Sequence, residues 1–225
     1  MAPPRGDARV GGVASAPSIG GRTASGDDRR VDEALIDAAL AGDQSAFGRL
    51  VERHQDRLYN TLLRFTGSPE DAQDIAQDAL VQALLKLDRF RRDSAFFTWL
   101  YRIAFNRAVS LSRKRRERVS LDGLQADGGL EAKSTTNQPE QEALACERAE
   151  LVHQALATLA EDHRQVLVLR EFDGLDYEQI AAIIETPVGT VRSRLFRARS
   201  QLREALEPYG LLDADDERGG EPMAD

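Results

Sequence analysis

The sequence is poor in the residues that build disulfides, metal sites and membrane spans. It contains one cysteine, Cys146, which excludes an internal disulfide. Its three histidines, His54, His153 and His163, are isolated and give no metal-ligand spacing. No stretch approaches the roughly 20 apolar residues that cross a bilayer. We therefore expect a cytoplasmic protein without a metal, a cofactor or a membrane insertion.

Catalytic motifs and strand patterns are also missing. There is no glycine-rich phosphate loop with its lysine and no recognisable nucleophile–base pair, which argues against an enzyme. The first 30 residues are rich in Gly, Pro, Ala and Ser and lack the apolar core of a signal peptide, so they are expected to form a disordered leader. No alternating strand pattern with hairpin turns is present. The sequence therefore predicts an all-α protein.

The chain carries a net charge of −8, but its basic residues are concentrated in two segments. Residues 101–118 hold seven Lys or Arg and one acid, and residues 188–203 hold five Arg and no acid. Acidic stretches follow each of them, at 119–150 and from Glu204 to the end. Because the local field decides where a polyanion docks, two basic segments in an acidic chain indicate two nucleic-acid contacts.

Apolar spacing predicts a first helical domain over residues 31–118. A short helix covers about 31–40, a second runs from Asp43 to Gly67, and "SPED" at 68–71 supplies a strong start for a third that reaches about Leu87. A fourth helix begins near Ser94 or Ala95 and enters the basic segment. The expected buried residues of the third helix are Ala72, Ile75, Ala76, Ala79, Leu80, Ala83, Leu84 and Leu87.

A flexible linker is expected at residues 119–139, where Gly, Pro and small polar residues replace the helical pattern. A second domain follows at 140–207, with helices at about 140–159, 162–172, 176–185 and 187–206. Residues 208–225 form an acidic tail, which we expect to be disordered. The predicted fold is thus two small helical domains joined by a flexible linker.

The last two helices have the character of a DNA-reading helix-turn-helix. Asp176 and Gln179 have capping-box spacing, while Thr186 can cap the next helix with Pro187 at its first position. In that last helix an apolar stripe repeats at Val191, Leu195, Ala198 and Leu202. The other face is basic and would enter a major groove, where arginine can contact guanine. The alternative is a solvated basic face, but acids at i, i+4 spacing are missing.

Residues 90–118 combine aromatic and basic side chains, so they could form core or a nucleic-acid surface. Trp99, Leu100 and Ile103 are expected to pack in the core. For Phe96 and Phe97, we expect one ring to pack and the other to line a pocket for a base, because stacking contributes about 1–3 kcal/mol per base. The sequence does not distinguish the two rings.

Both domains together resemble the extracytoplasmic-function sigma factors, and most closely the sigma-E type. The resemblance is carried by "LVERHQDRLYNTLLRFTG", "DAQDIAQDALVQALLKLDRFRRDSAFFTWLYRIAFNRA" and "LREFDGLDYEQIAAIIETPVGTVRSRLFRARSQL". It covers about residues 32–117 and 140–206. Two long motifs in the right order, separated by a variable linker, are specific, whereas a lone helix-turn-helix would be a weak signal.

The resemblance implies a transcription initiation factor. In this family, region 2 binds the clamp of core RNA polymerase, reads the −10 element and captures a flipped base of the single-stranded non-template strand. Region 4 binds the polymerase flap and reads the −35 element. An anti-sigma factor is an expected further partner, and a stress or envelope-related response the expected setting.

Matching positions imply three sets of site residues. The clamp-binding set comprises Asp74, Gln77 and Asp78. The −10 set comprises Arg92, Asp93, Ser94, Phe96, Phe97, Arg102, Asn106, Arg107, Arg113 and Arg115. The −35 set comprises Arg192, Ser193, Phe196 and Arg197, with Arg170, Tyr177 and Arg199 beside them. One departure is Arg92, which stands where the sigma-E type commonly has glycine and makes the loop stiffer and more basic.

Two other functions remain open at this stage. A conventional helix-turn-helix regulator would use the first domain to dimerise or to sense a signal, and would bind duplex DNA without polymerase. A protein whose basic segments bind an acidic partner would show no DNA-dependent activity. The sigma-factor hypothesis instead predicts DNA recognition that depends on polymerase.

Overall fold

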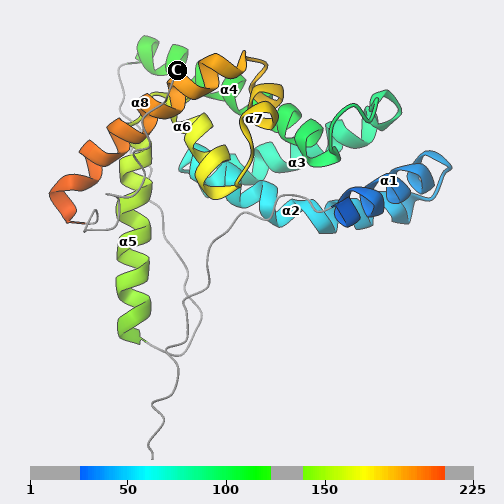
Figure 1. The fold of residues 1–225 in the computed structure, drawn as a ribbon, viewed down its shortest axis with the longest axis horizontal. Coiled ribbons are helices and arrows are strands. Elements are labelled where there is room, and N and C mark those ends of the chain that lie inside the picture. Colours follow the sequence, from blue (N-terminus) through cyan, green and yellow to red (C-terminus); the bar gives the residue numbers. More distant parts are fainter. Residues whose placement is uncertain (1–25, 123–138, 211–225) are drawn as a thin grey trace, which may run out of the picture.

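The computed structural model describes residues 26–122 and 139–210, and within these ranges every regular element is helical. The first part contains α1 (Gly26–Leu40), α2 (Gln44–Thr66), α3 (Pro69–Leu85), the short η1 (Leu87–Arg89) and α4 (Phe96–Asp122). The second contains α5 (Pro139–Thr158), α6 (Glu161–Leu167), the π-helical turn η2 (Val168–Phe172), α7 (Tyr177–Ile184), α8 (Val188–Leu206) and η3 (Glu207–Tyr209). The all-α prediction is confirmed (Figure 1).

The helix boundaries in the first part follow the predicted capping chemistry. The Asp43 carboxylate accepts from the Ser45 amide at 2.9 Å and starts α2. Gly67 ends α2 with a left-handed φ of 71°, which glycine adopts without strain. Ser68 then accepts from the Asp71 amide, with Pro69 in the first turn of α3. These caps fix the α2–α3 corner and so the direction of α3.

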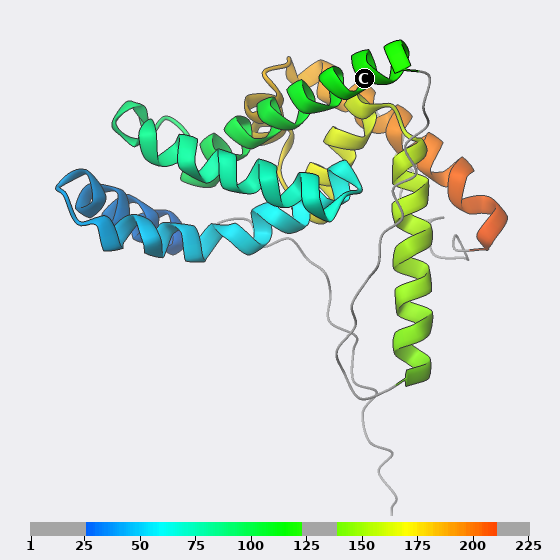
Figure 2. The ribbon, with the colours of Figure 1, turned by 180° about the vertical axis from the view of Figure 1, so that it is seen from behind.

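The interior of the first part is built by α1 to α4. Leu58 and Leu62 of α2 are fully buried, as are Leu100 and Ala104 of α4. The Phe65 ring meets the Phe105 ring edge-on, with centroids 5.1 Å apart. The long α4 lies across α2 and α3, so its first half is in the core while its basic end extends beyond (Figure 2).

The prediction that Leu84 is buried is wrong. Helix α3 turns one exposed apolar edge outward, with Val81, Leu84 and Leu85 at 55, 52 and 67% exposure. The helix ends at Leu85, and the chain then turns so that Leu87, in η1, points into the core. Because α2 and α4 pack against the other sides of α3, this edge stays exposed to solvent.

In the second part, α6, α7 and α8 surround a core that includes Leu167, Leu169 and Ile180. The capping box at α7 is confirmed, since Asp176 accepts from the Gln179 amide at 2.7 Å and its own amide donates to Gln179 at 3.0 Å. Helix α5 projects away from the rest of the molecule in both views (Figures 1 and 2). Within α8, Val191, Leu195 and Ala198 are buried, as the stripe predicts.

Thr186 does not cap α8 as expected. The N-cap is Pro187, and the Thr186 hydroxyl donates to the Ile184 carbonyl at 3.2 Å. Glu185 occupies the left-handed region at φ 52°, which tightens the turn and directs Thr186 back toward α7. The turn therefore depends on backbone geometry at Glu185 rather than on a threonine cap.

The boundaries of the predicted segments shift by a few residues. Helix α1 begins at Gly26, inside the stretch expected to be leader, and α4 continues to Asp122, inside the expected linker. The predictions for residues 1–25, 123–138 and 211–225 lie outside the described residues. The two predicted domains also pack against each other, because α7 lies along α4 and η2 meets α2 (Figure 2).

Candidate nucleic-acid and polymerase interfaces

Helix α8 presents the four predicted −35 residues on its outer face. The side chains of Arg192, Ser193, Phe196 and Arg197 are all exposed, and Phe196 at 76% is the most exposed large apolar side chain of the described residues. The buried stripe on the other side holds the helix so that this face points to solvent. Guanidinium groups around a bare aromatic ring are suited to phosphates, base edges and thymine methyl groups.

Arg170 and Tyr177 lie beside that face. The Tyr177 ring has the Arg170 guanidinium carbon 5.0 Å from its centroid and that of Arg192 5.6 Å away. Arg170 also donates to the Leu175 carbonyl at 2.7 Å and is partly buried. Arg170 thus braces the loop before α7, while the Tyr177 ring attracts the Arg192 guanidinium through a cation–π contact.

Two other arginines of α8 are engaged with acids from neighbouring elements. Arg199 donates twice to Glu171 of η2, at 2.7 and 3.0 Å, and Arg194 pairs with Asp162 of α6 at 2.6 Å. The sequence left Arg199 open between a DNA contact and a solvated residue. Its acid partner, Glu171, is 28 residues away in the sequence and on another element, so the i, i+4 spacing within α8 does not predict the pair.

The loop at residues 90–95 is fastened to α1. Arg92 has a φ of 60°, in the region that favours glycine, and its guanidinium pairs with Asp37. Arg29 donates to the Arg92 carbonyl at 3.2 Å. The Arg92 hydrogen bond lowers the pKa of the Asp37 carboxyl. Asp93, also in the −10 set, pairs with Arg91 at 3.3 Å, and Ser94 is half-buried.

Phe96 and Phe97 are both core residues, so the structure disagrees with the prediction that one of them lines a base pocket. Their exposed fractions are 3% and 2%. The Phe96 ring packs against Phe90 and Trp99, with centroids 5.9 and 5.8 Å apart. Phe97 lies under the Arg57 guanidinium at 5.2 Å. The reason is that α4 begins at Phe96 and turns both rings inward in its first turn.

The remaining residues of the predicted −10 set belong to α4. Asn106 and Arg107 are exposed, and Arg102 is half-buried one turn earlier. Arg102 lies 4.0 Å from Glu185 of the helix-turn-helix, so its surroundings come partly from the second domain. Arg113 is exposed, whereas the side chain of Arg115 lies outside the described residues.

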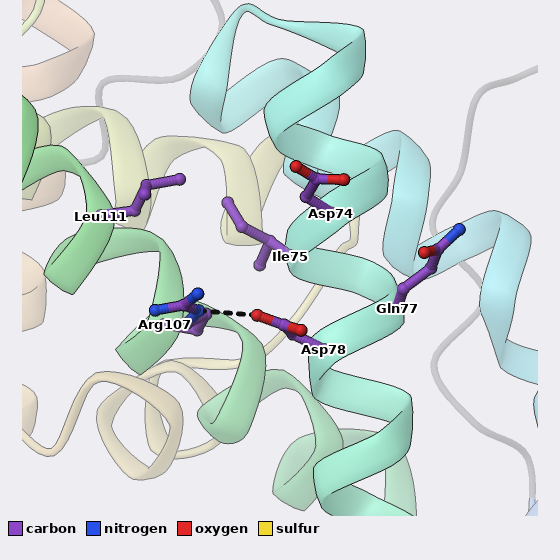
Figure 3. A pocket seen from close by; sticks show the side chains of 6 residues that line it. All are labelled: Asp74, Ile75, Gln77, Asp78, Arg107 and Leu111. Atoms are coloured by element: carbon purple, nitrogen blue, oxygen red, sulfur yellow. Dashed lines mark hydrogen bonds and ion pairs between the residues drawn. The ribbon is translucent and has the colours of Figure 1, made fainter.

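A pocket of about 320 Å³ lies between α3 and α4 and joins two of the predicted residue sets (Figure 3). Asp74, Gln77 and Asp78 line it from α3, and Arg107 and Leu111 line it from α4. Asp78 accepts from Arg107 Nε at 2.9 Å, shown as the dashed line in Figure 3. All three predicted clamp-binding residues are exposed, as expected.

Sequence reasoning missed a polar cluster inside the molecule. Thr61, Tyr101 and Asp173 are buried together where the two domains meet, with Arg57 beside them. The buried Thr and Asp each follow an ordinary helical pattern, so the sequence contains no signal that links residues 112 positions apart. Within the described ranges, no helix is long and apolar enough to cross a membrane, and no group of His, Cys, Asp and Glu could hold a metal.

A helical unit with a basic, partly aromatic helix, followed by a helix-turn-helix unit, defines the class of promoter-recognition proteins that contain sigma regions 2 and 4. The family model "Sigma-70 region 2" matches residues 50–118, and "Sigma-70, region 4" matches residues 149–202. The chain belongs to the sigma-70 family of RNA polymerase sigma factors, in the extracytoplasmic-function group. Such a protein directs RNA polymerase to promoters.

Among its relatives is the RNA polymerase sigma-H factor of Pseudomonas aeruginosa, 42% identical over 182 residues, which are 79% of this chain and 94% of the relative. The ECF RNA polymerase sigma-E factor of Escherichia coli is 41% identical over 187 residues, covering 80% and 97%. These comparisons confirm the predicted resemblance to the sigma-E type.

Two solved structures share the fold. The sigma factor RpoE in complex with the anti-sigma factor NepR from Bartonella quintana matches with a TM-score of 0.63 at 27% identity, covering 75% of this chain and 98% of that one. CnrH in complex with the cytosolic domain of CnrY matches with a TM-score of 0.58 at 29% identity, covering 79% and 98%.

Proposed function

We propose that this chain docks on core RNA polymerase through α3 and reads the two promoter elements with α4 and α8. The observation that carries the proposal is the presence of two separate basic reading surfaces on two helical units. One is the middle of α4, with Asn106 and Arg107 exposed, and the other is the outer face of α8. A conventional regulator needs only the second surface.

The polymerase-binding surface is one stripe of α3, which we name the α3 stripe. It runs from Asp74 through Gln77 and Asp78 to Val81, Leu84 and Leu85. The spacing of three and four residues places all of them on one side of the helix. Carboxylates at one end suit a basic partner residue, and the bare apolar end supplies area that becomes buried on docking. These features support the proposal that the α3 stripe docks on the polymerase clamp.

The −35 reader is α8 in a major groove. Arg192 and Arg197 flank Phe196 on the exposed face, and Ser193 lies between them. Arginine makes bidentate contacts to guanine, and each good pair contributes about 1–3 kcal/mol of discrimination. Arg199, engaged by Glu171, contributes mainly to the position of α8.

The −10 reader is α4 with the 90–95 loop. Arg102 lies one turn before the adjacent Asn106 and Arg107, so the three can follow a single strand, and the exposed Arg113 continues the basic side toward phosphates. Because Phe96 and Phe97 are buried, the flipped −10 base has to be held by polar groups of the loop, such as Arg92, Asp93 and Ser94, in this arrangement. The proposal includes an anti-sigma factor as a partner, since RpoE of Bartonella quintana was solved with one. It also includes a stress-related set of target promoters.

Transcription in vitro with purified core polymerase tests the proposal. A genomic library of promoter fragments is the template, and starts that require this chain are mapped. We expect starts preceded by shared −35 and −10 sequences, and a footprint that depends on polymerase. A footprint on duplex DNA by the free chain, unchanged by polymerase, would instead identify a conventional regulator.

A further inference from the structure

The conformation of the loop at residues 90–95 depends on side chains of α1 rather than on the loop's own backbone. Within the described parts of the chain, the backbone amides of residues 91–94 donate no hydrogen bond to another backbone group. Arg92 nevertheless holds a left-handed φ of 60°. That conformation is costly for a residue with a side chain, so it persists only where surrounding groups fix it. The groups that contact Arg92 therefore determine the shape of the loop.

Three charged side chains of α1 lie along the loop: Arg29, Glu33 and Asp37. They are four residues apart, which places them in one row on the helix, here called the α1 row. The Arg29 guanidinium donates to the Arg92 carbonyl at 3.2 Å and to Glu33 at 2.9 Å. The Asp37 carboxylate accepts from the Arg92 guanidinium. The α1 row thus holds both the backbone and the side chain of Arg92.

Helix α1 is a firm support because it is bound to α2 from inside. Asp32 of α1 is 5% exposed, and its two carboxylate oxygens lie 2.9 Å from Arg53 Nε and 2.9 Å from His54 Nε2. The His54 ring in turn packs against Phe96, the first residue of α4, with centroids 5.4 Å apart. The end of the loop is therefore fixed through the core, and its tip through the α1 row.

The loop lies closely against α1. Glu33 and Ile36 of α1 and Phe90 and Ser94 at the two ends of the loop line a space of only about 10 Å³. That volume is barely enough for one water molecule. A nucleic-acid base cannot enter between α1 and the loop, so a base held by the loop lies on the side that faces away from α1.

We propose that Arg29 and Asp37 of α1 are positioning residues for −10 recognition, because they fix the loop in the conformation whose outer side accepts the preferred −10 base. Arg92 is the point at which the loop is attached, so it acts through the position of the loop. Asp93 and Ser94 are then the loop residues that meet the base. The effect on base choice rests on the function proposed above, whereas the attachment of the loop to α1 does not.

The attachment is suited to selecting a loop conformation rather than to stabilising the fold. The Arg92 and Asp37 side chains are 37 and 63% exposed, and such a pair contributes little to stability because water and salt screen it. The hydrogen bond from Arg92 lowers the pKa of the Asp37 carboxyl, which keeps the pair charged at neutral pH. A site that discriminates between bases needs its groups held within about 0.5 Å. When fewer molecules have the competent loop, affinity for the preferred base falls in proportion.

The mobility of the loop in the free, full-length chain tests the attachment. Cys146→Ser removes the natural thiol, and a nitroxide on Asp93→Cys reports on the exposed tip of the loop. We expect Asp37→Ala and Arg29→Ala to raise the mobility of the nitroxide several-fold in its electron paramagnetic resonance spectrum. Asp37→Glu keeps a carboxylate within reach and should restore most of the wild-type spectrum. The matched control is Asp27→Ala, which removes another exposed carboxylate of α1 and should change nothing.

Selection of −10 strands measures the consequence for base choice. Holoenzyme made with each variant binds a single-stranded oligonucleotide library with random bases at the −10 positions, and the bound fraction is sequenced. We expect Asp37→Ala to lower the enrichment of the preferred base several-fold at one position, and Asp37→Glu to restore it. Discrimination among −35 duplexes by the same holoenzymes is the internal reference. It should not change, whereas a misfolded variant would lose both preferences.

The two measurements distinguish failure of this inference from failure of the proposed function. Unchanged nitroxide mobility in both alanine variants, or an equal rise in Asp27→Ala, would overturn the attachment of the loop to α1. If mobility rises as expected but wild-type holoenzyme has no −10 preference, the proposed function is wrong and the attachment stands. If wild-type holoenzyme has a −10 preference that both alanine variants keep in full, α1 does not position the −10 reader.

Discussion

Asp78 and Arg107 form an ion pair at 2.9 Å across the pocket between α3 and α4, although the sequence assigns them to different partners. Asp78 belongs to the polymerase-binding set and Arg107 to the −10 set. Both side chains are about half exposed, so the pair contributes only about 0–1 kcal/mol to stability. The pair matters for binding rather than for stability, because a partner group that pairs with the Asp78 carboxylate frees the Arg107 guanidinium.

Replacement of Asp78 separates these two roles. We expect Asp78→Ala to weaken binding to core polymerase and, by releasing Arg107, to strengthen binding of a single-stranded oligonucleotide by the free chain a few-fold. The melting temperature should barely change, since the pair is solvent-screened. Fluorescence anisotropy measures both affinities. In the double variant with Arg107→Ala, the gain in oligonucleotide affinity should disappear; a gain that persists would contradict release of Arg107.

The apolar end of the α3 stripe should carry much of the polymerase affinity. Leu85→Glu places a charge on an apolar surface that becomes buried on docking, so we expect core binding to weaken at least tenfold, or about 1.4 kcal/mol. Leu85 is 67% exposed, and the fold should be unaffected. Competition with a labelled wild-type chain for core polymerase provides the measurement. Val31→Glu, an exposed apolar residue of α1, is the control and should compete normally.

Two arginines of α8 differ in their surroundings and should differ in effect. Arg197 is exposed on the outer face of α8, while Arg199 donates twice to Glu171. Arg197→Ala should cost about 1–3 kcal/mol in promoter binding by the holoenzyme if it contacts a base. Arg199→Ala should cost less and lower the melting temperature slightly. Titration of a −35 duplex with holoenzyme that contains either variant measures the two losses of binding free energy. Equal losses would show that Arg199 also contacts the DNA.

Much of this architecture could be predicted because its determinants are local. The caps at Asp43, Ser68 and Asp176 and the buried stripe of α8 each depend on residues within a few positions, and all were confirmed. Thr186 is the exception. Thr186 does not cap α8 because Glu185 adopts a left-handed conformation that reorients the turn. A glutamate at this position does not predict that conformation.

Contacts between distant segments could not be predicted. Leu84 has the right spacing to be buried, but only the arrangement of α2 and α4 leaves its side of α3 open. By sequence, either Phe96 or Phe97 could line a base pocket, but the first turn of α4 places both rings in the core. The cluster around Asp173 needs two domains to meet, and pattern within one helix contains no information about that contact.

The backbone of Arg92 is strained. Its φ of 60° is costly for a residue with a side chain, by about 1–2 kcal/mol, and costs glycine little. Arg92→Gly and Arg92→Ala both remove the pair with Asp37, but only glycine also removes the strain. We therefore expect Arg92→Gly to unfold at a higher denaturant concentration than Arg92→Ala, by about 1 kcal/mol in free energy, a margin reduced by the greater freedom of glycine in the unfolded chain. Equal midpoints in urea would show that the loop relaxes without its left-handed turn.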